Sequence, residues 1–132
     1  KIQNLLTKYV SRSMLIEGKG RIINVSSIIG QTGFNGLSVY GATKSGMTGF
    51  TRSLSRELGK GGITVNTLAP GYMETGMTQG LDDASLGSIK RRSPMGKLAR
   101  VEDVAGSVIF LLGDDAKVIT GTCITVDAGS TA

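Results

Sequence analysis

Residues 21–71 read RIINVSSIIGQTGFNGLSVYGATKSGMTGFTRSLSRELGKGGITVNTLAPG, and the order of patterns in this stretch decides the fold. Apolar runs at 21–26 and 63–69 have the length and β-branched content of buried strands. Between them, from about Ser38 to Gly59, apolar side chains recur at helical spacing. A helix that connects two strands predicts that the strands lie parallel in an α/β fold.

The same alternation continues on both sides of this stretch. Residues 2–17 have the spacing of an amphipathic helix, and a third strand is expected at 122–127. Glu102 to Leu112 predicts another helix. Its inward side chains are expected to be Val104, Val108, Leu111 and Leu112.

Two segments are predicted to be less regular. Residues 28–37 are rich in glycine and predict a loop over the site at the end of the first strand. Residues 75–100 contain two methionines, Gly80, Gly87 and Pro94 around a short helix near 82–91, which is typical of a substrate lid. No internal repeat or low-complexity segment is found in the sequence.

Tyr40 and Lys44 carry the pattern that indicates chemistry. Side chains four residues apart share one face of a helix. A phenol ordinarily has a pKa of about 10, so it is a poor proton donor at neutral pH. A cation beside the phenol favours the ionised form and lowers this pKa. Ser27, thirteen residues before Tyr40 and at the end of a strand, can hold a carbonyl oxygen in the same cleft. Together they predict general acid–base reduction of a ketone or oxidation of an alcohol.

A Tyr-x-x-x-Lys pair alone is most often a surface pair without a role, so its surroundings matter. Pro70 and Gly71 follow the second predicted strand, as Ser27 follows the first. Ligands of parallel α/β sheets bind beyond the carboxyl ends of the strands. Tyr40 and Lys44 near the start of the long helix therefore converge with these strand ends on one edge of the sheet.

With these residues together, the chain resembles the short-chain dehydrogenase/reductase family along its whole length, and within it the 3-oxoacyl-acyl-carrier-protein reductases. The phrases that carry the resemblance are residues 21–30, 62–71 and 119–129. The resemblance implies an α/β fold with a three-layer, Rossmann-like, doubly wound parallel sheet. It also implies reduction of a carbonyl, most specifically a small-molecule or acyl-carrier-bound 3-oxoacyl thioester in fatty acid synthesis. NADP(H) is the implied cofactor, with NAD(H) as the alternative.

The resemblance also implies roles for particular residues. Ser27 would orient the substrate, Tyr40 would donate the proton, and Lys44 would bind the cofactor ribose and favour the phenolate. Pro70, Gly71, Met73 and Thr75 would line the cofactor pocket with Tyr40 and Lys44.

The chain departs from the family pattern at its beginning. Members of the family are about twice as long, and their first half holds the glycine-rich strand–turn–helix that binds the pyrophosphate. The family's catalytic asparagine would fall ahead of Lys1, and Asn4 does not align with it. We therefore expect residues 1–132 to be the C-terminal, catalytic half of one reductase domain. This half alone is expected to be inactive and to bind the cofactor poorly.

The composition of the chain argues against several other kinds of function. The chain has no histidine and one cysteine, which argues against a zinc site, and Cys123 is expected to be a buried, inert thiol. No apolar run reaches the roughly 20 residues of a membrane span. The net charge is +5, but no aromatic residues are interleaved with the basic residues around Lys90–Arg92, which disfavours nucleic acid. That segment is either solvated or receives an acidic carrier protein or a phosphorylated substrate arm. A cytoplasmic location is expected, or the mitochondrial matrix in a eukaryote.

The long helix also predicts assembly. One side of this helix has only small side chains, so another helix could approach it closely; these residues are Gly41, Ser45, Gly46 and Gly49. The apolar residues Met47, Phe50 and Leu54 lie on or beside the same side. We expect a homotetramer that uses this helix as a principal contact. The alternative is that the glycines face the cofactor or the chain's own sheet. Two other functions stay open: reduction of a sugar, steroid or small ketone, and an inactive fragment that serves only in assembly.

Overall fold

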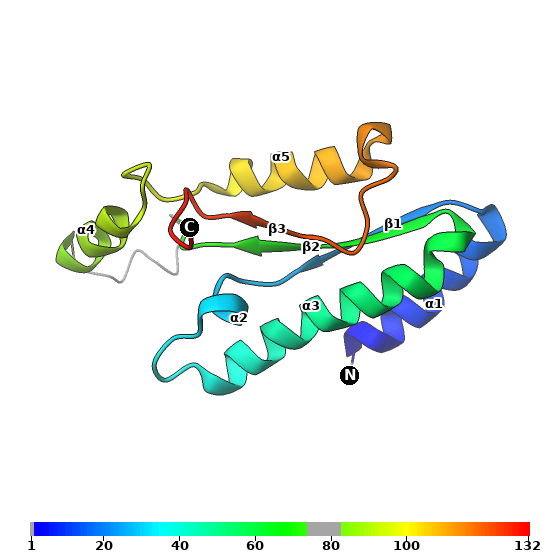
Figure 1. The fold of residues 1–132 in the computed structure, drawn as a ribbon, viewed down its shortest axis with the longest axis horizontal. Coiled ribbons are helices and arrows are strands. Elements are labelled where there is room, and N and C mark those ends of the chain that lie inside the picture. Colours follow the sequence, from blue (N-terminus) through cyan, green and yellow to red (C-terminus); the bar gives the residue numbers. More distant parts are fainter. Residues whose placement is uncertain (1, 74–82) are drawn as a thin grey trace.

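The computed structural model describes residues 2–73 and 83–132. Its centre is a three-stranded parallel sheet in the order β1-β2-β3 (Figure 1), which confirms the predicted parallel sheet. The strands are β1 (Gly20–Val25), β2 (Ile63–Pro70) and β3 (Cys123–Val126). β2 lies in the middle of the sheet and is buried along its whole length, as expected for a central parallel strand covered on both faces.

Helices cover both faces of the sheet and make three layers. α1 (Ile2–Glu17) and α3 (Ser38–Leu58) pack on one face, and α5 (Val101–Leu112) packs on the other (Figure 1). The shorter helices are α2 (Ile29–Thr32) and α4 (Asp83–Arg92), with single 3₁₀ turns at Gly59–Gly61 and Asp114–Ala116. Among the described residues, no helix combines the length and apolar character needed to cross a membrane.

Each face of the sheet has its own apolar core. Under α1 and α3 the buried cluster is Ile22, Leu58, Ile63 and Val65, with Met14 and Leu54 packed against it. Under α5 the buried cluster is Leu68, Leu111 and Ala116, packed by Val104 and Val108 among others. The alternation of side chains along β2 sends Val65 to one core and Leu68 to the other, so this one strand joins the two layers.

Three sequence predictions need correction. Residues 29–32 form the helix α2 inside the predicted loop, because Ile28 and Ile29 are buried and draw this segment onto the body of the protein. Leu112 is 53% exposed, since the inward stripe of α5 is narrow and ends at the fully buried Leu111. Cys123 is only half-buried, and its sulfur accepts a hydrogen bond from Gln31 Nε2 at 3.3 Å.

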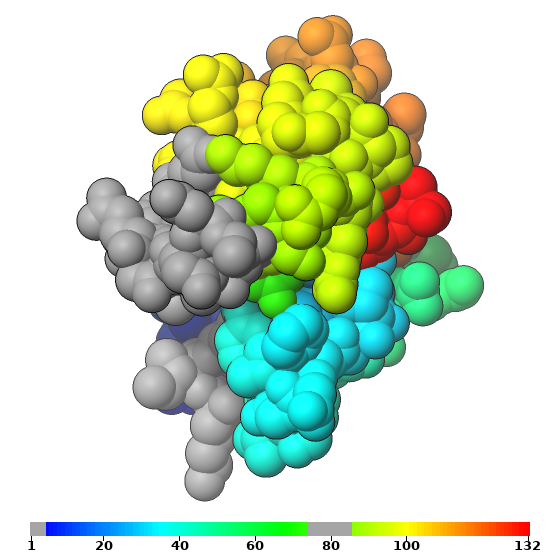
Figure 2. Space-filling view, turned by 90° about the vertical axis from the view of Figure 1, so that its left-hand side faces the viewer, coloured from blue at the N-terminus to red at the C-terminus, as the bar shows by residue number. Residues whose placement is uncertain are grey.

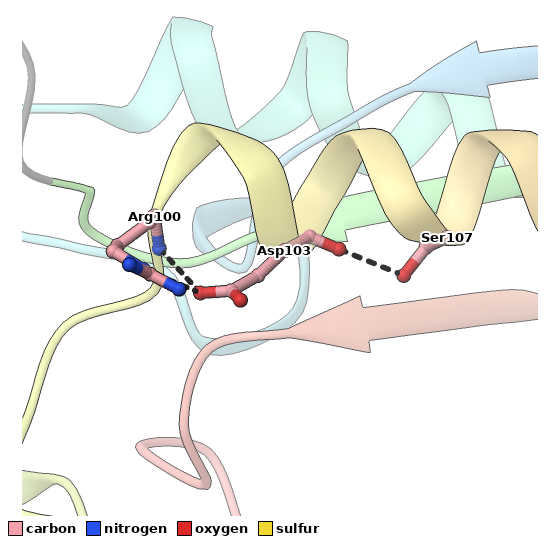
Figure 3. Close-up of polar contacts among 3 residues, drawn as sticks. All are labelled: Arg100, Asp103 and Ser107. Atoms are coloured by element: carbon pink, nitrogen blue, oxygen red, sulfur yellow. Dashed lines mark hydrogen bonds and ion pairs between the residues drawn. The ribbon is translucent and has the colours of Figure 1, made fainter.

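Two helix boundaries are fixed by local chemistry. Gly62 has φ +74°, and a Cβ there would overlap the carbonyl oxygen of Gly18, so the turns after α1 and α3 pack directly on each other. At the start of α5 the backbone N–H of Arg100 donates to Asp103 Oδ2 at 2.8 Å (Figure 3). The carboxylate of Asp103 in the first turn also complements the helix dipole.

A buried polar cluster holds α3 on the sheet. The hydroxyl of Thr51, which has no exposed surface, accepts hydrogen bonds from Asn24 Nδ2 at 2.8 Å and from Thr67 Oγ1 at 2.7 Å. These three residues come from α3, β1 and β2. Buried polar groups are stable only when bonded, so this cluster specifies how α3 is placed over the first two strands.

Candidate active site

The carboxyl ends of the three strands are bonded to one another at one edge of the sheet. Ser26 N–H donates to the carbonyl of Leu68 at 2.6 Å, and Ile28 N–H donates to that of Pro70 at 3.1 Å. Gly71 N–H donates to the carbonyl of Val126 at 2.9 Å. Figure 2 looks onto this edge, with α4 and the segment after it above, the residues of α2 and its loop below, and the C-terminal residues at the side. Ser27, Pro70 and Gly71 therefore lie together, as predicted.

Tyr40 and Lys44 meet at the same edge. The Lys44 Nζ lies 5.6 Å from the centroid of the Tyr40 ring, within the range of a cation–π contact. The same ammonium donates to the carbonyl oxygen of Val25 at 3.2 Å, two residues before Ser27. Tyr40 is 44% exposed, so its hydroxyl can be approached from outside. The structure thus brings the predicted tyrosine and lysine to the end of the strand that carries the predicted serine.

Ser27 is held by the first turn of α2. Its Oγ accepts a hydrogen bond from the backbone N–H of Ile29 at 3.2 Å. A hydroxyl that accepts one bond in this way still has its own proton to donate. The half-buried Ser27 can therefore donate to the oxygen of a carbonyl compound in the cleft.

Contacts that the sequence did not predict place Lys44 itself. The buried hydroxyl of Ser26 donates to the backbone carbonyl of Lys44 at 2.8 Å. A Cβ on Gly30 would lie 2.8 Å from the Lys44 carbonyl carbon and from Ser45 N, so only glycine lets α2 lie this close to α3. The Ser26–Ser27 doublet was visible in the sequence, but nothing in a pattern indicates which partner a serine will find.

The structure describes some of the other residues that were predicted to line the cofactor pocket, but not all of them. A Cβ on Gly71 would lie 2.6 Å from Asp127 Cβ, so packing against the end of β3 already requires glycine there. Met73 forms an isolated parallel bridge with Ala99. Thr75 and part of the predicted lid lie outside the described residues.

Asp127, at the end of β3, was not predicted to matter and organises the C-terminal turn. Partial burial would raise the pKa of its carboxyl, but hydrogen bonds outweigh this effect and lower the pKa below the ordinary value of 3.8. The donors are the Thr131 hydroxyl, Gly129 N–H, the Ser130 hydroxyl and Thr131 N–H. The ionised carboxylate thus fixes residues 129–131 against the carboxyl edge of the sheet.

A cavity of about 590 Å³ lies beside this edge, between α2, α4 and the C-terminal turn. Its apolar side chains include Ile28, Ile29, Phe34 and Ile89. Arg92, at the end of α4, contributes a cation, and none of the described residues that line it is acidic. The volume suits a small-molecule ligand. α4, which falls within the predicted lid, therefore forms a wall of this cavity.

Comparison with known proteins finds relatives that match almost the whole chain. A family model described as Enoyl-(Acyl carrier protein) reductase matches residues 4–131. The 3-oxoacyl-[acyl-carrier-protein] reductase of Haemophilus influenzae is 44% identical over 124 residues, which are 94% of this chain and 51% of that protein.

Two solved structures share the fold with TM-scores of 0.90 and 31% identity. One is a 3-oxoacyl-[acyl-carrier protein] reductase from Brucella melitensis, where 94% of this chain covers 47% of that chain. The other is a gluconate 5-dehydrogenase from Burkholderia cenocepacia in complex with NADP and tartrate, where 95% covers 50%. The chain spans about half the length of the relatives that it matches.

Proposed function

Because the chain belongs to the short-chain dehydrogenase/reductase family, we propose that its full-length gene product reduces a carbonyl to an alcohol with NADPH. Residues 1–132 are the C-terminal, catalytic half of the reductase domain in this proposal. The substrate is a 3-oxoacyl thioester on an acyl carrier, and the location is cytoplasmic, or the mitochondrial matrix in a eukaryote. The observation that carries the proposal is the convergence of Ser27 with the Tyr40–Lys44 pair at one strand end.

The proposed chemistry assigns each side chain one task. Ser27 donates a hydrogen bond to the ketone oxygen and holds it beside Tyr40. The Tyr40 hydroxyl transfers its proton to that oxygen as the carbon is reduced, and the Lys44 ammonium stabilises the phenolate that is left. The nicotinamide, when bound, supplies the hydride.

The residues at this edge fit such a cofactor. An ammonium has three N–H donors, and Lys44 uses one of them on the carbonyl of Val25. The others can reach the hydroxyls of a ribose. Pro70 ends β2 at the same edge and Gly71 follows it, and both would lie against the nicotinamide. The NADP in the related gluconate 5-dehydrogenase favours NADP(H) over the alternative, NAD(H).

The lining of the cavity bears on the substrate class. Its apolar side chains include Ile28, Ile29, Phe34 and Ile89, which suit an acyl chain. Arg92 could pair with an anionic group on the substrate arm. Thr32, Tyr72, Ser88, Ser130 and Thr131 add hydroxyl groups that would also serve a sugar-type substrate, so the preference for an acyl thioester rests on the apolar side chains, on Arg92 and on the likeness to 3-oxoacyl-[acyl-carrier-protein] reductases. A steroid or small ketone remains the second candidate, since its surface is also apolar.

The decisive test is the steady-state activity of Tyr40→Phe in the full-length gene product. Loss of the proton donor is expected to lower kcat by about 10²-fold or more. Tyr9→Phe is a matched control, because Tyr9 lies on α1 and is itself exposed, and it should keep wild-type kcat. Activity of Tyr40→Phe within about tenfold of wild type would rule out Tyr40 as the acid.

We also propose a homotetramer in which α3 is a principal contact. A Cβ on Gly46 or Gly49 would meet nothing within 4 Å, so the alternative that these two glycines face the chain's own sheet is wrong. α1, which packs on the same face of the sheet as α3, exposes large apolar side chains, among them Leu5, Leu6 and Tyr9. A face with exposed small residues on one helix and exposed apolar side chains on another is typical of a surface that packs against a neighbouring subunit.

Sedimentation of Gly49→Arg tests this assembly. The added side chain should shift the mass to a dimer or monomer, because it fills the surface that another helix would occupy. Gly106→Arg on α5 is the comparison, since a Cβ there also meets nothing within 4 Å. A tetramer that survives Gly49→Arg but dissociates with Gly106→Arg would move the contact from α3 to α5.

The alternative of an inactive fragment that serves only in assembly is tested on the 132 residues alone. We expect this chain to be inactive and to bind NADPH weakly, because it offers the nicotinamide and ribose contacts without the pyrophosphate-binding loop predicted to lie in the first half of the domain. Calorimetric titration that gave micromolar binding would contradict this expectation. Activity of the full-length gene product separates the enzyme from the assembly module.

A further inference from the structure

We propose that Ser26 is a positioning residue, whose hydroxyl sets the place of Lys44 and Tyr40 relative to Ser27. This proposal rests on the proposed carbonyl reduction. It assigns a task in that reaction to a side chain that the predicted mechanism does not use.

The hydrogen bonds at the end of β1 hold Lys44 at two points. The hydroxyl of Ser26, which is only 6% exposed, donates to the Lys44 backbone carbonyl at 2.8 Å. The carbonyl of the preceding residue, Val25, accepts from Lys44 Nζ at 3.2 Å. Two consecutive residues thus hold the main chain and the ammonium of Lys44, and the next residue is Ser27.

A second hydrogen bond from the region of β1, farther along α3, also fixes the position of this helix on the sheet. Asn24 lies on β1, and Ser26 directly follows the strand with its N–H still bonded to the carbonyl of Leu68. The two residues are two apart, and both side chains bond to α3 on the same face of the sheet. Asn24 bonds to Thr51 and Ser26 to Lys44, and these partners are seven residues, or about two turns, apart on α3. Gly30 adds the close approach of α2 to the backbone of Lys44 and Ser45.

Removal of the Ser26 hydroxyl would release only the end of α3 that carries Tyr40. Thr51 would still hold the helix through Asn24 and Thr67. Tyr40 lies about one turn before Lys44, so a small shift at Lys44 moves both side chains relative to Ser27. A displacement of about 1 Å at reacting groups can cost about 10²-fold in rate.

The chain offers a closely matched control in Ser55. Its hydroxyl is also buried, at 8% exposure, and donates to the carbonyl of Arg52 at 2.8 Å. Ser26→Ala and Ser55→Ala therefore each delete one oxygen and one bond of equal length to a carbonyl of the same helix. Only the first of these bonds lies at the candidate active site.

The experiment compares both variants in the full-length gene product, with kcat expressed per folded enzyme. Both should lower Tm by similar amounts. Ser26→Ala should lower kcat about tenfold or more and raise the KM for NADPH about threefold, since Lys44 would bind the ribose. Ser55→Ala should leave both constants within about twofold. Ser26→Cys, which keeps a weak donor in a similar volume, should recover part of the lost kcat.

The outcomes separate the two proposals. An active wild-type enzyme whose Ser26→Ala and Ser55→Ala variants share the same kcat and KM would overturn the positioning role alone. A fall in kcat that follows the folded fraction, with KM for NADPH unchanged, would also overturn it. A wild-type gene product that reduces no carbonyl compound would overturn the proposed function, and the role of Ser26 with it.

Discussion

The two halves of α3 differ in what they contact. Its second half turns Thr51, Ser55 and Leu58 into the protein, where all three are buried. Its first half carries Tyr40, which is 44% exposed, and Lys44, whose ammonium contacts the carbonyl of Val25 at the end of β1 and the ring of Tyr40. One helix thus combines a half that stabilises the fold with a half that presents reactive groups. Substitutions in the two halves should therefore separate activity from stability.

The largest effect is expected from Lys44→Met in the first half. The neutral side chain can neither stabilise a Tyr40 phenolate nor bind a ribose, so kcat/KM should fall by about 10²–10³-fold. Urea unfolding should change little, because Lys44 is not part of either apolar core. Lys60→Met, just after the helix, is the control and should keep wild-type kinetics. A stability loss in Lys44→Met as large as that of Thr51→Val would remove the distinction between the two halves.

The second half is tested by Thr51→Val, a change that keeps the volume and removes the hydroxyl. Asn24 and Thr67 lose their bonds to Thr51 in the interior, so the free energy of unfolding should fall by about 1–3 kcal/mol. Urea denaturation measures this loss, and kcat per folded enzyme should stay within about threefold.

Thr43→Val is the matched control on the first half of the helix. The Thr43 hydroxyl is exposed and donates to the carbonyl of Val39 at 2.9 Å. The free energy of unfolding should therefore change by no more than about 0.5 kcal/mol. Equal losses in the two threonine variants would show that the buried cluster does not distinguish the halves.

The smallest effect on stability is expected for a substitution of Asp127. This residue lies at the end of β3, at the same edge of the sheet as the first half of α3. Its pKa in the fold is lowered below 3.8, so the ionised carboxylate stabilises the fold above that range. This contribution is lost as the pH falls from about 4 through the lowered pKa. Asp127→Asn should therefore lower Tm near neutral pH, and the gap to wild type should narrow toward pH 3. A gap that does not change with pH would mean that the charge contributes nothing.

The fold could be predicted from the sequence because the apolar patterns have simple periods. The runs at 21–26 and 63–69 indicated strands that are observed within one residue of those bounds. The position of Ser27 and of Pro70–Gly71 after those runs was enough to predict one shared edge. The predictions that were wrong depend on side-chain packing, which the spacing of apolar residues does not indicate. Leu112 lies at a helical spacing from Val108 yet faces outward.

The polar contacts were the least predictable part of the site. Lys44 lies 18 residues from Ser26 in the sequence, and Asn24 and Thr67 lie 27 and 16 residues from Thr51. A serine or threonine can bond to any nearby carbonyl or amide. The role of Asp127 could not be predicted, because its partners are small polar residues that are common in turns. Only the docked helix and strands show which of these groups meet.

The Thr51 cluster has a consequence for how the protein opens. Its three members belong to β1, α3 and β2, and departure of any one element leaves bonds unmade in an apolar interior. Partial opening within this group is therefore costly, so the three elements should exchange their amide hydrogens as one cooperative unit. Among residues 86–92, whose side chains the structure describes, α4 contributes no buried side chain to either apolar core, so it should exchange much sooner. The wall that α4 contributes to the cavity beside the sheet edge should therefore fluctuate while β1, β2 and α3, which carries Lys44, stay packed together.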